Sequence, residues 1–163
     1  MKINLLILIV VISYNFLGAQ SFTENDSLYI TALEKYTIEI DSFYTKYNVN
    51  NIKYDTLYIN KNGVVDNLPS RIHGRCVIIL SDTNKIEIYE RNKNEIVEVK
   101  LFPIEIKSGQ IEITIVPYQC KFNKKDELNI EYNYLISAWT NVFFKYDCNK
   151  RKWKYDRTKN GGV

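Results

Sequence analysis

The sequence feature that most constrains the fold is a long alternation of apolar and polar residues at positions 95–122, with Ser108-Gly109 at its centre. Side chains of a strand point alternately to its two faces, so this run predicts one β-hairpin with the Ser-Gly pair at its tip. The apolar residues change face once in each arm, after Leu101 and before Val116, and these two residues fall opposite each other in the expected register. The base half and the tip half of the hairpin should therefore cover different layers.

Two prolines predict an irregularity in this hairpin. The register that pairs Ile106 with Ile111 places Pro103 and Pro117 at ladder positions of opposite parity, and hydrogen-bonded pairs alternate along an antiparallel ladder. One proline must then fall where a ladder N–H is needed, and proline has none. We therefore expect a bulge or a break in the ladder. It should lie near residues 100–103 and 114–117.

The N-terminal region is typical of a secretory signal peptide. Lys2 precedes an apolar run at 5–12, and small residues end the region at Ala19. We expect cleavage of residues 1–19, which would leave Gln20 first, and an uncleaved anchor is the alternative. The apolar run is shorter than the roughly 20 residues that a spanning helix needs, and no later run is long enough. The mature chain should therefore lack a transmembrane segment and be secreted or periplasmic.

The remaining residues, 20–163, have the composition of one globular domain. The chain is 45% hydrophobic and 25% charged, which is ordinary for a folded core and not for disorder. Its formal net charge is +3, and loss of Lys2 with the signal peptide lowers this to 3 − 1 = +2. A charge this small does not by itself imply a polyanionic partner. Only the last residues, Asn160-Gly161-Gly162, are expected to form a frayed tail.

The pattern along the domain predicts one helix followed by a series of strands. Apolar residues recur at three- and four-residue steps over 24–46, which predicts an amphipathic helix of about six turns. Short alternating segments follow, and the short turns between them predict sequential antiparallel strands. The strands expected outside the long hairpin are at 54–59, 75–81, 85–90, 128–136, 142–146 and 153–155.

We therefore expect an α+β fold in which the N-terminal helix packs on a strongly curved antiparallel meander sheet of about six to eight strands. A calycin-like closed β-barrel with an N-terminal helix is the alternative. The order of elements is also compatible with a cystatin-like or nuclear-transport-factor-like α+β layer. These are analogies of architecture and imply no function.

The three cysteines, Cys76, Cys120 and Cys148, leave one over after any single disulfide. An exported chain permits disulfides, and Cys120 and Cys148 both lie in expected strands or at strand ends, so the two could form a bridge. The plainer interpretation is that the cysteines are small buried hydrophobic residues.

No pattern of residues points to catalysis, a metal or a cofactor. His73 is the only histidine, and although Cys76 lies three residues away, nothing indicates a third group that would orient a Cys–His pair. Neighbouring carboxylates such as Glu95 and Glu98 belong to an expected strand, and strand carboxylates on a polar face are normally solvated. The cysteine and histidine spacings do not match those of structural zinc, and no phosphate-binding or dinucleotide motif is present.

The C-terminal hairpin carries the strongest charge asymmetry in the chain. Its cations could meet an anionic membrane, glycan or other envelope component, whereas nucleic acid is not an expected partner of an exported protein. The alternative is that lysines on an edge strand only prevent sheet-to-sheet aggregation. The candidate anionic-surface residues are Lys145, Lys150, Arg151, Lys152 and Lys154.

Aromatic residues gather in the same part of the chain, in a register that pairs Tyr146 with Trp153. If the C-terminal strands curl, the rings could surround a cavity for an apolar or glycan ligand. The plainer interpretation is that they pack against the Tyr- and Phe-rich stripe of the expected helix. The candidate ligand-binding residues are Tyr132, Tyr134, Tyr146, Trp153 and Tyr155.

Together these patterns favour a small exported, non-catalytic protein that binds a ligand or a partner protein. One alternative is a cell-envelope interaction module that uses the basic C-terminal hairpin. The other is a hydrolase with an unrecognised site.

Overall fold

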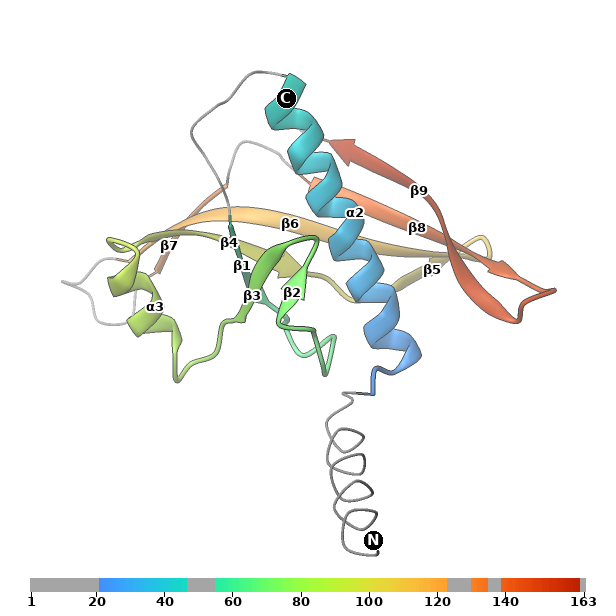
Figure 1. The fold of residues 1–163 in the computed structure, drawn as a ribbon, viewed down its shortest axis with the longest axis horizontal. Coiled ribbons are helices and arrows are strands. Elements are labelled where there is room, and N and C mark those ends of the chain that lie inside the picture. Colours follow the sequence, from blue (N-terminus) through green and yellow to red (C-terminus); the bar gives the residue numbers. More distant parts are fainter. Residues whose placement is uncertain (1–20, 47–54, 123–129, 135–138, 162–163) are drawn as a thin grey trace, which may run out of the picture.

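In the computed structural model, which describes residues 21–46, 55–122, 130–134 and 139–161, two helices lie against a curled mixed β-sheet (Figure 1). Among these residues the sheet has nine strands in the order β2-β3-β1-β4-β6-β8-β9, and β5 and β7 both pair with β6. No described helix is both long and apolar enough to cross a bilayer. In chain order the elements are α2 (Glu24–Lys46), β1 (Thr56–Asn60), β2 (Arg71–Ile72), β3 (Arg75–Ile79), α3 (Lys85–Arg91), β4 (Glu95–Leu101), β5 (Glu105–Lys107), β6 (Gln110–Phe122), β7 (Ile130–Tyr134), β8 (Trp139–Asp147) and β9 (Lys152–Gly161).

Helix α2 begins at a reciprocal cap and has the bounds that the periodicity predicts. The Oγ1 of Thr23 accepts the N–H of Asp26 at 3.0 Å, and Asp26 Oδ2 accepts the N–H of Thr23 at 3.1 Å, which is a capping-box arrangement. The other oxygen of Asp26 accepts the N–H groups of Asp66 and Asn67 at 3.0 and 3.1 Å. One buried carboxylate therefore fixes both the helix start and the loop that follows β1.

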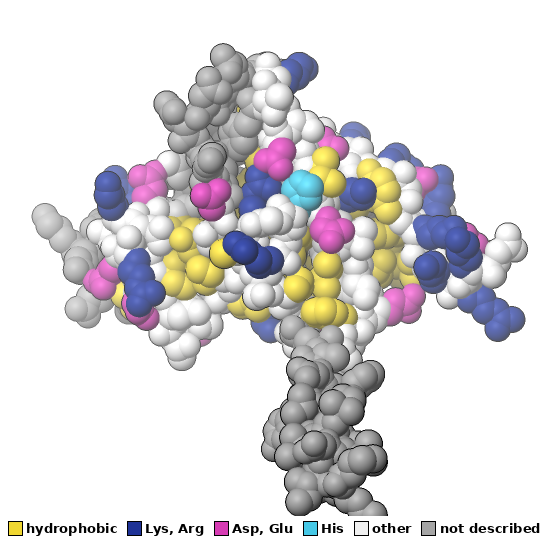
Figure 2. All heavy atoms as spheres, viewed as in Figure 1, with side chains coloured by type: hydrophobic (Ala, Val, Ile, Leu, Met, Phe, Trp, Pro, Cys, Tyr) yellow, Lys and Arg dark blue, Asp and Glu magenta, His cyan; other side chains and the backbone are white. Residues whose placement is uncertain are grey.

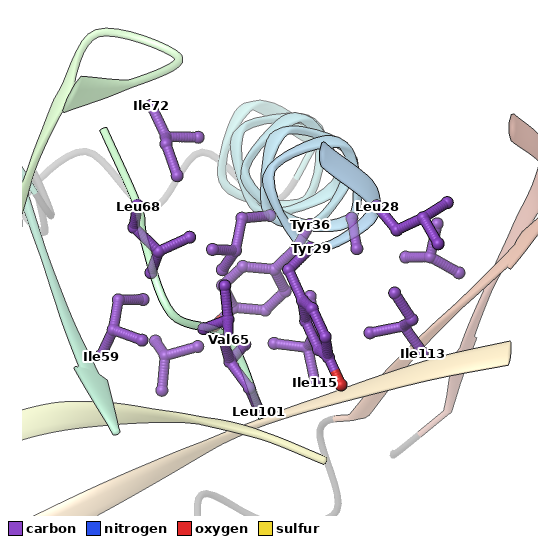
Figure 3. Packing of buried hydrophobic residues seen from close by; sticks show 14 of the residues in the cluster. Leu28, Tyr29, Tyr36, Ile59, Val65, Leu68, Ile72, Leu101, Ile113 and Ile115 are labelled. Atoms are coloured by element: carbon purple, nitrogen blue, oxygen red, sulfur yellow. The ribbon is translucent and has the colours of Figure 1, made fainter. Parts of the chain in front are cut away.

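The apolar stripe of α2 packs into the main hydrophobic core between this helix and the sheet (Figure 3). Tyr29 and Tyr36 point from the helix into this core, and the Tyr29 hydroxyl donates a hydrogen bond to the carbonyl oxygen of Phe102 at 2.8 Å. Toward its C-terminal end the helix leaves the core. Phe43, which the stripe predicts as buried, is 55% exposed.

Helix α2 also spans the gap between the two sides of the curled sheet. Asp41 forms an ion pair with Arg75 in β3, beside the edge strand β2. Glu39 accepts a hydrogen bond from Asn160 in the opposite edge strand, β9, at 2.9 Å. In the described part of the chain β2 and β9 end the strand order and are not paired with each other, so the closed-barrel alternative does not form there.

The sheet is mixed and not antiparallel throughout. Strand β1 lies between β3 and β4 and is parallel to both, whereas β4, β6, β8 and β9 are joined by antiparallel pairs. The expectation of an antiparallel meander is therefore wrong for the N-terminal part of the sheet. Two connections are the cause: the segment that contains β2 brings β3 back parallel to β1, and a helical connection between β3 and β4 gives β4 the same direction.

That connection is α3, in a segment that the alternation of residues 85–90 predicts as a strand. Its buried residues are Ile88 and Tyr89, whereas Ile86 is 50% exposed. Two adjacent buried residues fit one face of a helix and not one face of a strand. The strand prediction is wrong because so short a segment gives too few repeats to separate the two periods.

The hairpin of β4, β5 and β6 contains the expected break. Ile106 pairs with Ile111 as expected, but Leu101 pairs with Ile115, one residue away from its expected partner. The outgoing arm has one more residue than the returning arm between β4 and β5, at the position of Pro103. The missing N–H of this proline therefore falls in the break and not in a ladder.

The change of apolar face predicts that the two halves of the hairpin cover different layers, and this holds for β6 but not for β4, whose base-half residue Val99 lies in the main core. In the tip half, Ile113 and Ile115 belong to the main core under α2. In the base half, Tyr118 and Cys120 belong to a second core together with Tyr89 of α3. The first pair has odd numbers and the second pair even numbers, so the two cores lie on opposite faces of β6. Each helix thus covers one face of the sheet, at opposite ends of this strand.

The C-terminal hairpin has the expected register at its tip and a bulge further along. Tyr146 pairs with Trp153, and the register shifts by one residue after Phe143. The shift pairs Arg157 with Phe143, so Arg157 stays on the same face of the hairpin as Lys154.

The structure describes residues up to Gly161 at the C-terminal end but begins at residue 21 at the N-terminal end. The expected signal peptide, residues 1–19, lies outside the described residues. Asn160 and Gly161, which we expected in a frayed tail, pair with Thr140 and Trp139 in β8. Gly162 also lies outside the described residues.

Candidate functional site

The end of the β8–β9 hairpin, residues 145–155, projects from the sheet, and we call it the hairpin arm (Figure 1). Strand β6 begins at Gln110, whose partner on β8 is Lys145, so the arm extends past the end of its neighbouring strand. A turn at 148–151 closes the arm. Asp147 Oδ1 accepts the N–H of Lys150 at 3.0 Å, and Arg151 takes up the left-handed region with φ of 49°.

The two faces of the arm differ in chemistry because side chains alternate along its strands. Tyr146, Trp153 and Tyr155 lie on one face, where the Tyr146 and Trp153 rings meet edge to face with centroids 5.3 Å apart. Tyr146 is 46% and Tyr155 39% exposed. The alternation places Lys145, Lys152 and Lys154 on the opposite face.

The cations of the arm fall into two groups. Two of them have acidic partners: Lys145 contacts Asp156 at 2.9 Å, and Lys154 forms an ion pair with Asp147. These contacts have an electrostatic consequence. The Lys154 side chain, helped by the Lys150 N–H, lowers the pKa of Asp147, and the Lys145 side chain lowers the pKa of Asp156.

The other three cations lie at or beside the turn: Lys150, Arg151 and Lys152 are exposed, and no described acidic side chain forms an ion pair with them. Figure 2 shows Lys and Arg side chains gathered at this projecting end of the molecule. The structure therefore brings the five predicted anionic-surface residues together on one element, and three of them keep their charge unpaired.

The five predicted ligand-binding aromatics do not lie together along one strand pair. Tyr132 and Tyr134 belong to β7, which pairs with residues 118–122 of β6. Strand β8 pairs instead with residues 110–115 of the same strand. The backbone thus places β7 at the base half of the hairpin, and the side chains of β7 lie outside the described residues. The arm brings together Tyr146, Trp153 and Tyr155 alone.

All three cysteines are free, and the Cys120–Cys148 bridge that the sequence permits is not formed. Cys120 is buried in the second core, whereas Cys148 is exposed in the turn of the arm. Strand β6 runs about 33 Å from Gln110 to Cys120, and Cys148 lies beyond the Gln110 end. The interpretation as a small buried hydrophobic residue therefore fits Cys120 and not the exposed Cys76.

A buried polar cluster that the sequence does not reveal surrounds Glu98. This side chain has no solvent exposure, and its carboxylate accepts a hydrogen bond from Asn60 Nδ2 at 2.7 Å. Lys85 Nζ lies 3.1 Å from the other carboxylate oxygen. The Tyr89 hydroxyl lies 3.5 Å and the Cys120 Sγ 4.0 Å from that same oxygen. Our expectation that Glu98 is solvated is wrong, because the face predicted as polar is covered by α3.

The chemistry available to this cluster is limited by burial. Burial is the main cause that raises the pKa of the Cys120 thiol, and the nearby Glu98 charge raises it further. A protonated thiol is a poor nucleophile, and neither Cys120 nor Glu98 is exposed to a substrate. The cluster instead ties α3 to β1, β4 and β6.

Neither His73 nor the one groove described below brings together a set of side chains typical of a catalytic site. His73 is exposed in the β2–β3 turn, and its Nε2 lies 3.6 Å from Asp41 on α2. A shallow groove of about 380 Å³ lies between β1, β4, β6 and the C-terminal end of α3. Its lining includes two carboxylates, Asp55 and Glu95, of which Glu95 accepts a hydrogen bond from Gln119.

Within the described ranges no group of three or more His, Cys, Asp or Glu side chains could hold a metal ion. Comparison with protein-family models, with curated proteins and with solved structures finds no match to this chain.

Proposed function

We propose that the chain is a small exported, non-catalytic binding protein and that its hairpin arm binds an anionic partner. The observation that carries the proposal is the state of the turn cations. Lys150, Arg151 and Lys152 are exposed at a projecting end, with no acidic partner among the described residues. Three like charges so close together repel one another, and an anionic partner would relieve that repulsion.

The distribution of charge in the chain supports the same proposal. Residues 145–159 hold seven cations and two carboxylates, a net 7 − 2 = +5, whereas the expected mature chain has only +2. The rest of that chain therefore carries 2 − 5 = −3. Such segregation steers a partner of opposite sign to one end of the molecule.

The non-catalytic part of the proposal rests on burial. Cys120 and Glu98, a thiol and a carboxylate 4.0 Å apart, are enclosed between α3 and the sheet. Their contacts hold α3 against the sheet, which is a structural role that requires no substrate.

The proposal is tested by reversing the three turn charges with Lys150→Glu, Arg151→Glu and Lys152→Glu together. With heparin as the probe polyanion, we expect affinity at low salt to fall about 100-fold, because each cation near an anionic surface contributes about 1 kcal/mol. Wild-type binding should weaken steeply as salt is raised.

A variant with the same change in net charge serves as the control. Arg71, Lys93 and Lys121 are exposed and lie on β2, the α3–β4 turn and the end of β6. Their reversal to Glu should lower affinity far less than reversal of the arm. Equal losses in the two triple variants would show that overall charge, and not the arm, governs binding, and would contradict the proposal.

A further inference from the structure

We infer that the anionic partner is the surface of a lipid bilayer that contains anionic headgroups, and that the aromatic face of the arm enters its interfacial region. This inference rests on the proposed function and names the partner of the same element. It adds a second observation to the charges: exposed aromatic side chains on the arm face opposite the lysines.

The aromatic face of the arm is continuous with other apolar side chains on the same side of the sheet. Cross-strand pairs join Ile106 to Ile111, Ile111 to Phe144, and Phe144 to Tyr155. The two inner members are buried, whereas Ile106 is 71% exposed. The apolar side chains of this face are thus exposed at its two ends, on the arm and at β5, and buried between them.

Cations border this apolar surface. Lys35 of α2 places its Nζ 4.5 Å from the centre of the Tyr155 ring. Figure 2 shows hydrophobic side chains between α2 and the Lys- and Arg-rich end of the hairpin. A ring with an apolar body and a polar tip next to a long cationic side chain is the combination that suits the boundary between headgroups and acyl chains.

A bilayer explains both features of the arm, whereas a soluble polyanion explains one. Sulfate or phosphate groups of a polymer would engage Lys150, Arg151 and Lys152 and leave the aromatic face exposed. At an anionic bilayer, the same cations meet headgroup phosphates while Tyr146 and Trp153 lose water-exposed surface. The strength of peripheral binding grows with the apolar area buried and with the attraction of cations to anionic lipids, and the arm supplies both.

Tryptophan fluorescence can report this insertion directly, because the chain has two tryptophans and one lies on the arm. The other, Trp139, lies at the far end of β8, where it is paired with Gly161. In a Trp139→Phe background, all tryptophan emission comes from Trp153. We expect a blue shift with vesicles of phosphatidylcholine and phosphatidylglycerol, quenching by brominated lipids, and neither effect with phosphatidylcholine alone.

Two variants separate the two signals, and heparin binding separates this inference from the proposed function. Tyr146→Ser with Tyr155→Ser should weaken vesicle binding about tenfold or more and leave heparin binding unchanged. Charge reversal of the three turn residues should weaken both. Phe43→Ser, at an exposed aromatic of α2, is the matched control and should change neither. If the double variant has a lower urea midpoint, Tyr146→Ser alone is used.

Three outcomes would count against the inference. Vesicle binding without a shift in Trp153 emission, unaffected by the tyrosine variants, means electrostatic adsorption and overturns it. Salt-dependent heparin binding without vesicle binding also overturns it and leaves the proposed function standing. Absence of both kinds of binding overturns the inference and the proposed function together.

Discussion

Lys85 Nζ, on the first turn of α3, lies 3.1 Å from a carboxylate oxygen of Glu98, whose side chain in β4 has no solvent exposure. The contact joins the short helix to the face of the sheet that α2 does not cover. Because α3 is only seven residues long, tertiary contacts of this kind must supply most of its stability.

Removal of one partner of this pair should be costly. Lys85→Met leaves the Glu98 carboxylate buried without its cation, and we expect the free energy of unfolding to fall by about 3 kcal/mol. The double variant Lys85→Met with Glu98→Gln removes both charges and should recover much of that loss. Urea denaturation at pH 7 measures both, and a single variant as stable as wild type would show that the pair contributes little.

Acid should weaken the link between α2 and the β1–β2 loop. Burial raises the pKa of Asp26, but hydrogen bonds from Asn67, Thr23 and Asp66 outweigh it, so the pKa lies below its usual value of 3.8. The unfolded state then takes up its proton first as pH falls. The contribution of the Asp26 carboxylate to the free energy of unfolding is therefore complete above pH 3.8 and is lost as pH falls through the lower pKa of the folded state.

Asp26→Asn should remove this dependence and lower stability by about 1 to 2 kcal/mol at pH 7. Urea midpoints measured from pH 6 down to pH 3 compare the variant with wild type. Asp82→Asn, at an exposed position, is the control and should keep the wild-type acid profile. A parallel pH profile in the Asp26 variant would contradict the assignment.

The three thiols should differ in reactivity. At pH 8 a soluble disulfide reagent should modify Cys76 and Cys148 rapidly, because both are exposed. Cys120 should react only when α3 opens or the protein unfolds, since burial covers its sulfur and raises its pKa. Mass spectrometry of the labelled peptides distinguishes the sites. Rapid labelling of Cys120 in the native protein would mean that the second core is open in solution.

The elements predicted correctly from the sequence are those whose pattern repeats over many residues. The helix at 24–46 repeats its apolar stripe over several turns, and its bounds are correct. The long hairpin is correct in its tip pairing and its break, since both follow from alternation and from the missing proline N–H. The Tyr146–Trp153 pairing is correct for the same reason.

The errors arise where local pattern does not determine tertiary position. Residues 85–90 are compatible with either period, and the helix formed there makes β4 parallel to β1. That helix also covers Glu98, and the prediction of a strand at the same place gave no reason to expect this burial. In the candidate site, the arm cations are adjacent in sequence and could be grouped. The separation of β7 from the arm arises because β7 and β8 pair with different parts of β6. No local sequence pattern indicates which part each strand pairs with.

The break in the hairpin leads to a prediction about alkaline stability. The Tyr29 hydroxyl donates to the carbonyl oxygen of Phe102, which lies directly after β4 ends. Burial raises the pKa of Tyr29 from 10.0 to about 12. The unfolded state therefore loses its phenolic proton first, so this contribution to stability is complete below pH 10 and is lost as pH rises from 10 toward 12. Tyr29→Phe should cost about 1 kcal/mol at neutral pH and lessen the alkaline loss. Urea midpoints at pH 7, 9 and 10.5 test this, and an equal alkaline loss in both proteins would assign it to other groups.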